Sequence, residues 1–339
     1  MEIFQIIKRN DVKSGKNEKI TIVGGGLSGP VMAMYLSEKG YRVDIYERRP
    51  DMRKTNIFAG RSINLAVSKR GITALEEIGV FHKISSQLIP MYGRIIHDID
   101  GSTRFMPYGR PDQYINSVSR SELNILLMTE AEKTDRIRIL FQHSCSGMDL
   151  ESGTVFITNE VNGDQVTLQG TPVIAADGSG SAVRESMIES GHISGSFDPL
   201  GHSYKELSIP PDKSDEFQLE PNALHIWPRG KFMLIALPNM DRSFTVTLFL
   251  PNTGDISFST VRYLDDLNSL FEKNFPDIFE LMPSLKTDYF SNPTGKLGTV
   301  RCSQWNVNES VLIGDAAHAV VPFFGQGMNA SFEDCTVLN

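Results

Sequence analysis

Residues 19–47 of this 339-residue chain read KITIVGGGLSGPVMAMYLSEKGYRVDIYE. The stretch begins with a short apolar run at 19–23, passes through a glycine-rich turn into a helical pattern that ends near Gly40, and closes with an alternating segment at 41–47. A strand, turn, helix and second strand in this order form a βαβ unit, whose two strands lie parallel. The sequence therefore predicts an α/β fold with a parallel sheet that begins here.

The turn in this unit matches G-x-G-x-x-G, a dinucleotide-binding pattern, at Gly24, Gly26 and Gly29. Gly24 allows the tight turn, Gly26 leaves room for a diphosphate, and Gly29 lets the helix pack closely on the strand. Leu27 leads into the helix whose free N–H groups would face the diphosphate, and Glu47 would accept from a ribose hydroxyl. The pattern indicates adenosine diphosphate but does not separate FAD from NAD, and a glycine-rich turn without a ligand is the alternative.

A segment near the other end of the sequence favours FAD. Residues 311–329 read VLIGDAAHAVVPFFGQGMN, with a carboxylate directly after an apolar strand and a Pro-Gly-rich turn before a predicted helix. Flavin ribityl hydroxyls need such an acceptor, and a glycine-rich backbone can approach the flavin ring closely, whereas an NAD dehydrogenase requires neither. For the Gly-Asp dipeptide alone an ordinary strand-ending turn is the alternative. The residues expected at the flavin here are Gly314, Asp315, Gly325, Gly327 and Met328.

A third segment, PVIAADGSGSAVRES at 172–186, again predicts strand, turn and helix. Asp177 ends the strand and is a candidate cofactor contact, while Arg184 could pair with Asp177 or meet a phosphate. A purely structural salt bridge is equally compatible with this segment. We interpret His318 as structural, and because the histidines show no H-E-x-x-H spacing we predict neither a metal site nor an acid-base catalytic residue.

The composition limits the function classes. The net charge of -8 disfavours non-specific binding to nucleic acid or anionic lipid. The three cysteines form no Cys-x-x-Cys pair, which fits a reducing cytoplasm. We expect no membrane segment, because no run of about 18 apolar residues occurs. Residues 1–18 lack signal-peptide features and predict a short arm before the first strand.

The region from about 200 to 290 has a different pattern, with extended apolar segments ended by proline and little helix. It predicts an antiparallel sheet in a second domain inserted into the first. Asp100-Gly101 between two short strand patterns predicts a hairpin. We expect a discontinuous cofactor domain at 1–75, 110–195 and 296–339, and a substrate domain at 76–109 and 196–295.

The segments GGGLSG, ADGSGSAVR and GDAAHAVVPFFGQGMN together resemble the three signatures of single-component flavin-dependent aromatic hydroxylases. More narrowly, GRSINLAVSKRG at 60–71, EPNALHIWPRG at 220–230 and PFFGQGMN are similar to the kynurenine 3-monooxygenase family. The resemblance implies a Rossmann-like FAD-binding domain of the aromatic-hydroxylase type with an inserted antiparallel-sheet substrate domain.

The resemblance also implies a reaction. Members of this family bind FAD, use NADPH as a transient co-substrate, and hydroxylate L-kynurenine to 3-hydroxykynurenine with O2 through a C4a-hydroperoxyflavin. The reaction belongs to the kynurenine pathway of tryptophan catabolism and NAD biosynthesis. Only one G-x-G-x-x-G occurs, so NADPH would have no dinucleotide-binding domain of its own.

Several residue roles follow from the resemblance. Arg94 would anchor the substrate carboxylate, Tyr108 would donate to the same carboxylate, and Asn329 would be a polar contact in the active site. Without the motif context these residues would be a surface arginine, a core tyrosine and a helix cap. The expected wall of the aromatic pocket is Met233, Leu237 and Phe249, and the further expected flavin contacts are Glu47, Arg48 and Arg120.

The family normally continues with a helical region beyond the position of Asn339, and we expect that region to be absent from this chain. FAD binding is expected to survive its absence. Three alternatives stay open at this point: a hydroxylase of another aromatic acid, a flavin-binding protein that is uncoupled or inactive, and an NAD-only dehydrogenase.

Overall fold

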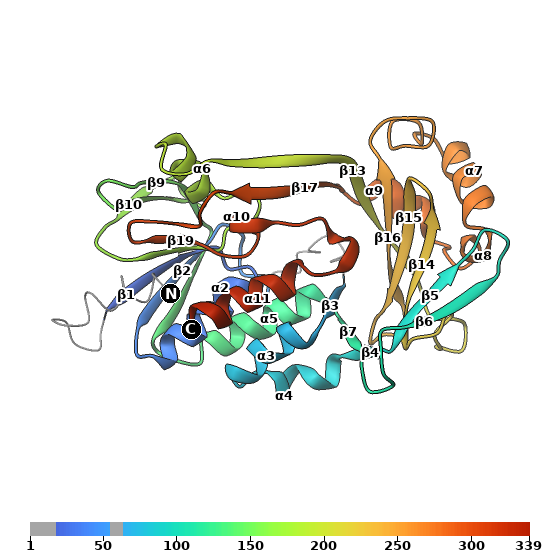
Figure 1. Cartoon of the computed structure of the whole chain (residues 1–339), viewed down its shortest axis with the longest axis horizontal. Helices are drawn as coiled ribbons and strands as arrows, with labels where there is room; N and C mark the ends of the chain where they lie inside the picture. The colour runs from blue at the N-terminus through green and yellow to red at the C-terminus, as the bar shows by residue number, and fades with distance from the viewer. Residues whose placement is uncertain (1–17, 55–63) are drawn as a thin grey trace.

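The computed structural model describes residues 18–54 and 64–339. The predicted N-terminal arm and the first residues of the GRSINLAVSKRG segment lie outside the described residues. Figure 1 shows two parts side by side: a mainly parallel sheet packed against helices, and a second sheet with helices on one face. Two long strands, β13 (Gly195–Ile209) and β17 (Thr294–Cys302), run between the two parts (Figure 1).

The first sheet confirms the predicted βαβ unit. Strand β1 (Lys19–Val23) pairs in parallel with β2 (Arg42–Glu47), and α2 (Ser28–Glu38) connects them. The strand order is β18-β19-β12-β1-β2-β8, with β18 alone antiparallel to its neighbour. The other strands are β8 (Ile137–Phe141), β12 (Val173–Ala175), β18 (Asn306–Val307) and β19 (Ser310–Leu312).

Helices cover one face of this sheet and a small sheet covers the other. Helix α11 packs between α2 and α3, and α2 also packs against α5. Apolar side chains from these helices and from β1 and β2 form the first core. The helices of this part are α3 (Lys69–Glu77), α4 (Phe81–Ile84), α5 (Arg120–Ala131), α6 (Ala182–Glu189), α10 (Asp315–His318) and α11 (Gly327–Leu338), with 3-10 turns η1 (Ser85–Gln87) and η2 (Pro322–Phe324). The small sheet is β9 (His143–Asp149), β10 (Thr154–Asn159) and β11 (Gln165–Leu168).

The second sheet has the order β17-β13-β16-β15-β14-β5-β6. Its strands, besides the two long ones, are β5 (Gly93–His97), β6 (Thr103–Pro107), β14 (Ala223–Arg229), β15 (Phe232–Pro238) and β16 (Phe244–Pro251). One face packs against α7 (Leu264–Asn274), α8 (Pro276–Phe279) and α9 (Leu285–Ser291) in a separate core. A third short sheet, β3 (Leu65–Val67), β7 (Ile115–Val118) and β4 (Ile89–Met91), joins the two parts.

The second sheet differs from the prediction in one pairing. The predicted hairpin at Asp100-Gly101 is present, and Gly101 has the positive φ of 85° that such a turn requires. However, β5 pairs in parallel with β14, so the sheet is mixed rather than purely antiparallel. β5 and β14 lie about 130 residues apart in sequence, so no local sequence pattern indicates whether they pair in parallel or antiparallel.

Three of the four predicted domain boundaries fall inside elements, and the fourth, at 109/110, lies between β6 and β7. The boundary at residue 76 lies within α3, and Ile78, Val80 and Ile84 beyond it pack into the first core. The boundaries near 195 and 296 fall in the strands that serve both parts. We propose that the substrate part begins near β5 rather than at residue 76.

A buried polar chain ties the second sheet to α8. The carbonyl of Glu220 accepts from His225 Nε2 at 2.8 Å, so His225 Nδ1 is an acceptor for His97 Nε2 at 2.9 Å. His97 Nδ1 in turn donates to the Asp277 carboxylate at 3.0 Å, and Trp227 donates to the same oxygen. Burial is the largest cause that lowers the pKa of His225 to about 4.

This chain gives the first testable prediction. Between pH 6.5 and 4 the unfolded chain protonates His225 while the folded chain does not, so acid removes roughly 3 kcal/mol of the free energy of unfolding. His225→Gln, whose amide can accept from His97 and donate to Glu220, should lose correspondingly less stability in urea titrations at pH 7 and pH 4.5. Exposed His82→Gln is the control and should follow the wild type. Equal pH dependence in all three proteins would contradict the assignment.

Candidate functional site

The predicted cofactor residues meet at one edge of the first sheet. The glycine-rich turn follows β1, Glu47 ends β2, Asp177 follows β12, and Gly314 follows β19. These four strands are neighbours and parallel, so their carboxyl ends lie together. Ligands of open parallel sheets bind at this edge.

The three positions of the glycine motif carry glycine for different structural reasons. Gly24 has a φ of 102°, and a Cβ there would lie 2.4 Å from the carbonyl oxygen of Ala176. A Cβ on Gly29 would lie 2.1 Å from the carbonyl oxygen of Gly24. A Cβ on Gly26 would meet no described atom within 4 Å. The fold therefore requires Gly24 and Gly29, whereas the open space at Gly26 has the form of a ligand cradle.

Glu47 is buried and holds the glycine-rich turn. Its Oε2 accepts from the backbone N–H of Gly25 at 2.8 Å, and its Oε1 accepts from the N–H and Nε of Arg49. Although burial opposes it, these hydrogen bonds and the Arg49 charge hold the pKa of Glu47 below its ordinary value. Arg49, which sequence reasoning did not select, pairs with Glu47.

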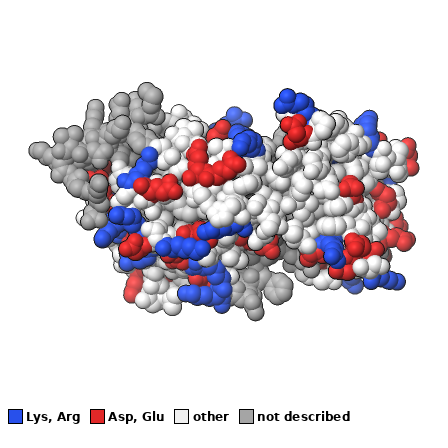
Figure 2. Space-filling view, turned by 90° about the horizontal axis from the view of Figure 1, so that it is seen from below, with Lys and Arg blue, Asp and Glu red and all other residues white. Residues whose placement is uncertain are grey.

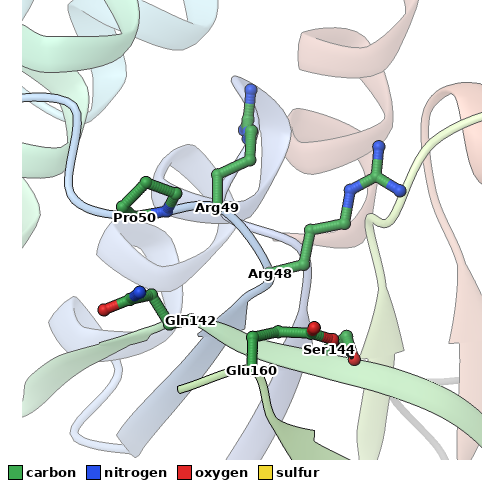
Figure 3. Close-up of a pocket in the computed structure, with 6 residues that line it drawn as sticks. All are labelled: Arg48, Arg49, Pro50, Gln142, Ser144 and Glu160. Carbon is green, nitrogen blue, oxygen red and sulfur yellow. Dashed lines mark hydrogen bonds between the residues drawn. The ribbon is translucent and has the colours of Figure 1, made fainter. Parts of the chain in front are cut away.

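An open groove lies beside the end of β2. Figure 3 shows Arg48 and Arg49 rising from the end of this strand, with Gln142, Ser144 and Glu160 along the opposite side. Ser144 donates to Glu160. Arg48 lines this groove, and its predicted contact with the adenosine end of the cofactor stays a prediction.

One carboxylate oxygen of Asp177 is buried and unpaired within the part of the chain that the structure describes. Its Oδ2 accepts from the N–H of Ala182 at 2.9 Å, while its Oδ1 is buried without a partner among the described residues. Burial is the largest cause that raises the pKa of this carboxyl. Arg184 does not pair with Asp177: it is buried and donates to the carbonyls of Ala316 and Ser179, at 3.0 and 2.6 Å. Arg184 thus joins the Asp177 turn to α10.

Asp315 opens α10 directly after Gly314. Its side chain is accessible to solvent, but it lies in a recess crowded by protein atoms, and this desolvation raises the pKa of the carboxyl. The positive charge of Arg120, at the start of α5, acts in the opposite direction. The structure therefore brings Arg120 close to Asp315, as expected for two residues at one cofactor.

The turn from Gly325 to Asn329 differs in part from expectation. Gly325 has the left-handed φ of 60°, and a Cβ on Gly327 would lie 3.8 Å from Asp315 Oδ1, so this turn faces the Asp315 recess. The Met328 side chain packs into the first core, which leaves only its backbone for a ligand. Asn329 is fully buried: its Oδ1 accepts from Ser68 N–H, and its Nδ2 donates to the carbonyls of Ala66 and Gly325. These bonds tie α11 to β3, so we do not propose Asn329 as a substrate contact.

Arg94 and Tyr108 lie together at the second sheet. The Arg94 guanidinium carbon is 5.1 Å from the centre of the Tyr108 ring. Arg94 Nε is buried without a partner, and Arg94 has no acidic partner among the residues that the structure describes. Burial raises the pKa of Tyr108 to about 12, so its hydroxyl stays a hydrogen-bond donor at neutral pH. A cation with a free buried N–H beside a phenol is suited to an anionic ligand group.

The expected pocket wall lies on the sheet face opposite α7, α8 and α9. Met233 and Phe249 are cross-strand partners, and Leu237 shares their face because residues alternate along a strand. The Phe249 ring contacts Phe323 of η2 edge to face, with centroids 5.2 Å apart, so the wall reaches the flavin turn. Sequence reasoning missed Thr247 on this face, whose hydroxyl is buried without a described partner. Only the strand alternation could have indicated it.

Three observations bear on other partners. Basic and acidic side chains are interspersed over the face shown in Figure 2. Among the described residues, no group of three or more His, Cys, Asp or Glu side chains could hold a metal ion. Across residues 18–54 and 64–339, no helix is long and apolar enough to cross a membrane.

Comparison with known proteins gives the family. The model of the "FAD binding domain" matches residues 17–339. The chain is 44% identical to a kynurenine 3-monooxygenase of Myxococcus xanthus over 330 residues, which are 97% of this chain and 71% of that protein. The kynurenine 3-monooxygenase of Dictyostelium discoideum is 43% identical over 94% of this chain and 68% of its own length. The chain belongs to the kynurenine 3-monooxygenase family.

Solved structures confirm the predicted fold of this kynurenine 3-monooxygenase family member. A 2-methyl-3-hydroxypyridine-5-carboxylic acid oxygenase superposes with a TM-score of 0.75 at 20% identity, over 96% of this chain and 86% of that chain. Klebsiella pneumoniae HpxO, solved with FAD and uric acid, gives a TM-score of 0.74 at 19% identity, over 95% of this chain and 78% of that chain. Both likenesses concern the fold alone.

The FAD expected of this family fits the residues present. The open space at Gly26 admits a diphosphate, the free Asp177 Oδ1 offers an acceptor, and the recessed Asp315 faces the turn at Gly327. Gly24 to Gly29, Glu47, Arg120 and the Gly314–Asp315 turn would hold the cofactor along the carboxyl edge of the sheet. FAD is the cofactor of this family, and the NAD-only alternative is not supported.

Proposed function

We propose that this chain hydroxylates L-kynurenine to 3-hydroxykynurenine, using bound FAD, NADPH as a transient co-substrate, and O2. The observation that carries the substrate assignment is Arg94, whose buried Nε lacks a partner and whose guanidinium lies against Tyr108. A carboxylate that bridges these two side chains would satisfy both. The names of the relatives support the same substrate.

The geometry of the second sheet suits an aromatic amino acid. Arg94 pairs with Leu224 on β14, and β14 pairs with β15, which carries Leu237, so the anchor and the wall are two strands, or about 10 Å, apart. Arg94 would hold the carboxylate while Leu237, Met233 and Phe249 exclude water from the ring. The side chains thus bind and orient the ring.

Bound FAD would supply the oxygen-activating chemistry, as cofactors do in such enzymes. The contribution of the chain is to place the flavin edge beside the wall, and the contact of Phe323 with Phe249 joins the two regions. We also propose a cytoplasmic location, for which the described cysteines offer modest support because all three are free.

The direct test measures product rather than cofactor consumption alone. FAD-loaded protein with NADPH in air should convert L-kynurenine to 3-hydroxykynurenine, and it should not hydroxylate 4-hydroxybenzoate, which lacks the amino-acid tail. NADPH oxidation that yields hydrogen peroxide without 3-hydroxykynurenine would instead identify an uncoupled flavoprotein. Preferred hydroxylation of another aromatic acid would replace the substrate assignment.

A further inference from the structure

The carboxylate of Asp334, on α11, contacts the Gly314–Asp315 turn. Asp334 Oδ2 accepts from the backbone N–H of Gly314 at 2.7 Å and from His318 Nε2 at 2.7 Å. Gly314 precedes α10 and His318 ends it, so one carboxylate oxygen accepts hydrogen bonds at both ends of this short helix. Asp334 and His318 are both partly buried, with side chains 17% and 21% exposed, so solvent screens their interaction only in part.

The residue that Asp334 holds has a conformation that needs support. Gly314 has φ 59° and ψ -139°, which only glycine adopts readily. Its Cβ position is closed as well, because a Cβ there would lie 2.7 Å from Ser331 Oγ. This backbone sets the direction of the next side chain, the Asp315 carboxylate in the recess. A loss of the Gly314 hydrogen bond would therefore be expected to move Asp315.

The charges around this turn are balanced. The hydrogen bond to Asp334 is the largest cause that raises the pKa of His318, and the charge of Asp315 adds to it. Burial is the largest cause that raises the pKa of Asp315; the charges of Arg120 and His318 oppose this rise, and the negative charge of Asp334 adds to it. The other groups near the cluster are the Trp305 ring on His318, the buried Cys335 thiol and the Arg184 guanidinium on α10.

We propose that Asp334 and His318 are positioning residues for the flavin. Asp334 fixes the Gly314–Asp315 turn, and the positive charge of His318 offsets the repulsion between the Asp315 and Asp334 carboxylates. Neither side chain needs to contact the cofactor. FAD affinity should consequently depend on Asp334, and it should weaken as the pH rises through the pKa of His318, because the cluster then gains net negative charge near an anionic ligand.

The test is the FAD dissociation constant of the apoprotein, followed by flavin fluorescence from pH 6 to 9. Asp334→Ala should raise this constant roughly 10- to 100-fold, since it removes a charge-assisted hydrogen bond to the turn. Asp334→Asn, which keeps an acceptor for Gly314, should recover part of the loss. His318→Gln should abolish the inflection with pH that the wild type shows.

The matched control is Glu333→Ala, which removes the same charge one residue earlier on α11, where Glu333 pairs with exposed Arg70. It should leave the dissociation constant within twofold of the wild type. Equal losses in Glu333→Ala and Asp334→Ala, or unchanged binding in Asp334→Ala, would overturn the proposal. If Asp334→Ala does not fold, Asp334→Asn and His318→Gln decide by the pH profile. A wild type that binds no FAD would overturn the cofactor assignment itself, a separate outcome.

Discussion

Replacing Arg94 with methionine will abolish the stimulation of NADPH oxidation by L-kynurenine. Methionine keeps much of the side-chain volume but removes the positive charge that we assign to the substrate carboxylate. Loss of a buried charged partner for the substrate carboxylate should lower kcat/KM for L-kynurenine roughly 100-fold or more. The measurement is steady-state NADPH oxidation with and without L-kynurenine.

The control for this variant lies on the adjacent strand. Arg104 of β6 is exposed, and Arg104→Met changes the net charge equally without touching the wall. It should retain the wild-type response. Bound flavin should be unchanged in both variants, because Arg94 belongs to the second sheet. Undiminished stimulation of Arg94→Met by L-kynurenine would remove Arg94 from the substrate site.

Replacing Gly26 with alanine should remove FAD binding while leaving the protein folded. An alanine Cβ there meets no described atom within 4 Å and requires no unusual φ, so the thermal midpoint of the apoprotein should stay within about 2 °C of the wild type. The same Cβ would occupy the space between the backbone and the diphosphate, so FAD affinity should fall roughly 100-fold. Differential scanning fluorimetry and flavin fluorescence measure the two effects separately.

Alanine substitutions at two other glycines serve as comparisons for Gly26→Ala. Gly29→Ala should instead destabilise the fold, because its Cβ would overlap the Gly24 carbonyl oxygen at 2.1 Å. Gly180→Ala, at an exposed position with equally open surroundings, should change neither stability nor affinity appreciably. Normal FAD affinity in Gly26→Ala would show that the diphosphate does not lie on this turn.

The elements predicted well are those whose pattern is local. The β1, α2 and β2 segments alternate or repeat within a short window. Strand β13 was missed over its 15 residues, because its first half from Gly195 is exposed and contains proline and glycine. Its register also shifts between Pro199 and Ser203, so no single alternation runs through it.

The candidate site divides in the same way. Glycines at strand ends can be recognised in the sequence, because a tight turn or a close backbone approach there favours glycine over other residues, as at Gly24 and Gly314. Asp334 gave no signal: an aspartate near the end of a helix is ordinarily a solvated charge, and its partner at Gly314 lies twenty residues earlier. The hydrogen bonds of Asn329 gave no signal for a related reason, since its backbone partners Ser68 and Ala66 are more than 250 residues distant.

The two long strands that belong to both parts restrict how this architecture can be recombined. β13 and β17 pair with each other on both sides of the register shift between Pro199 and Ser203, so the connection between the two parts consists of hydrogen-bonded strands. A chimera that transplants the pocket of another hydroxylase must therefore exchange both strands together. A graft cut through only one of them would leave an unmatched edge, and its failure to express would say nothing about the pocket it carried.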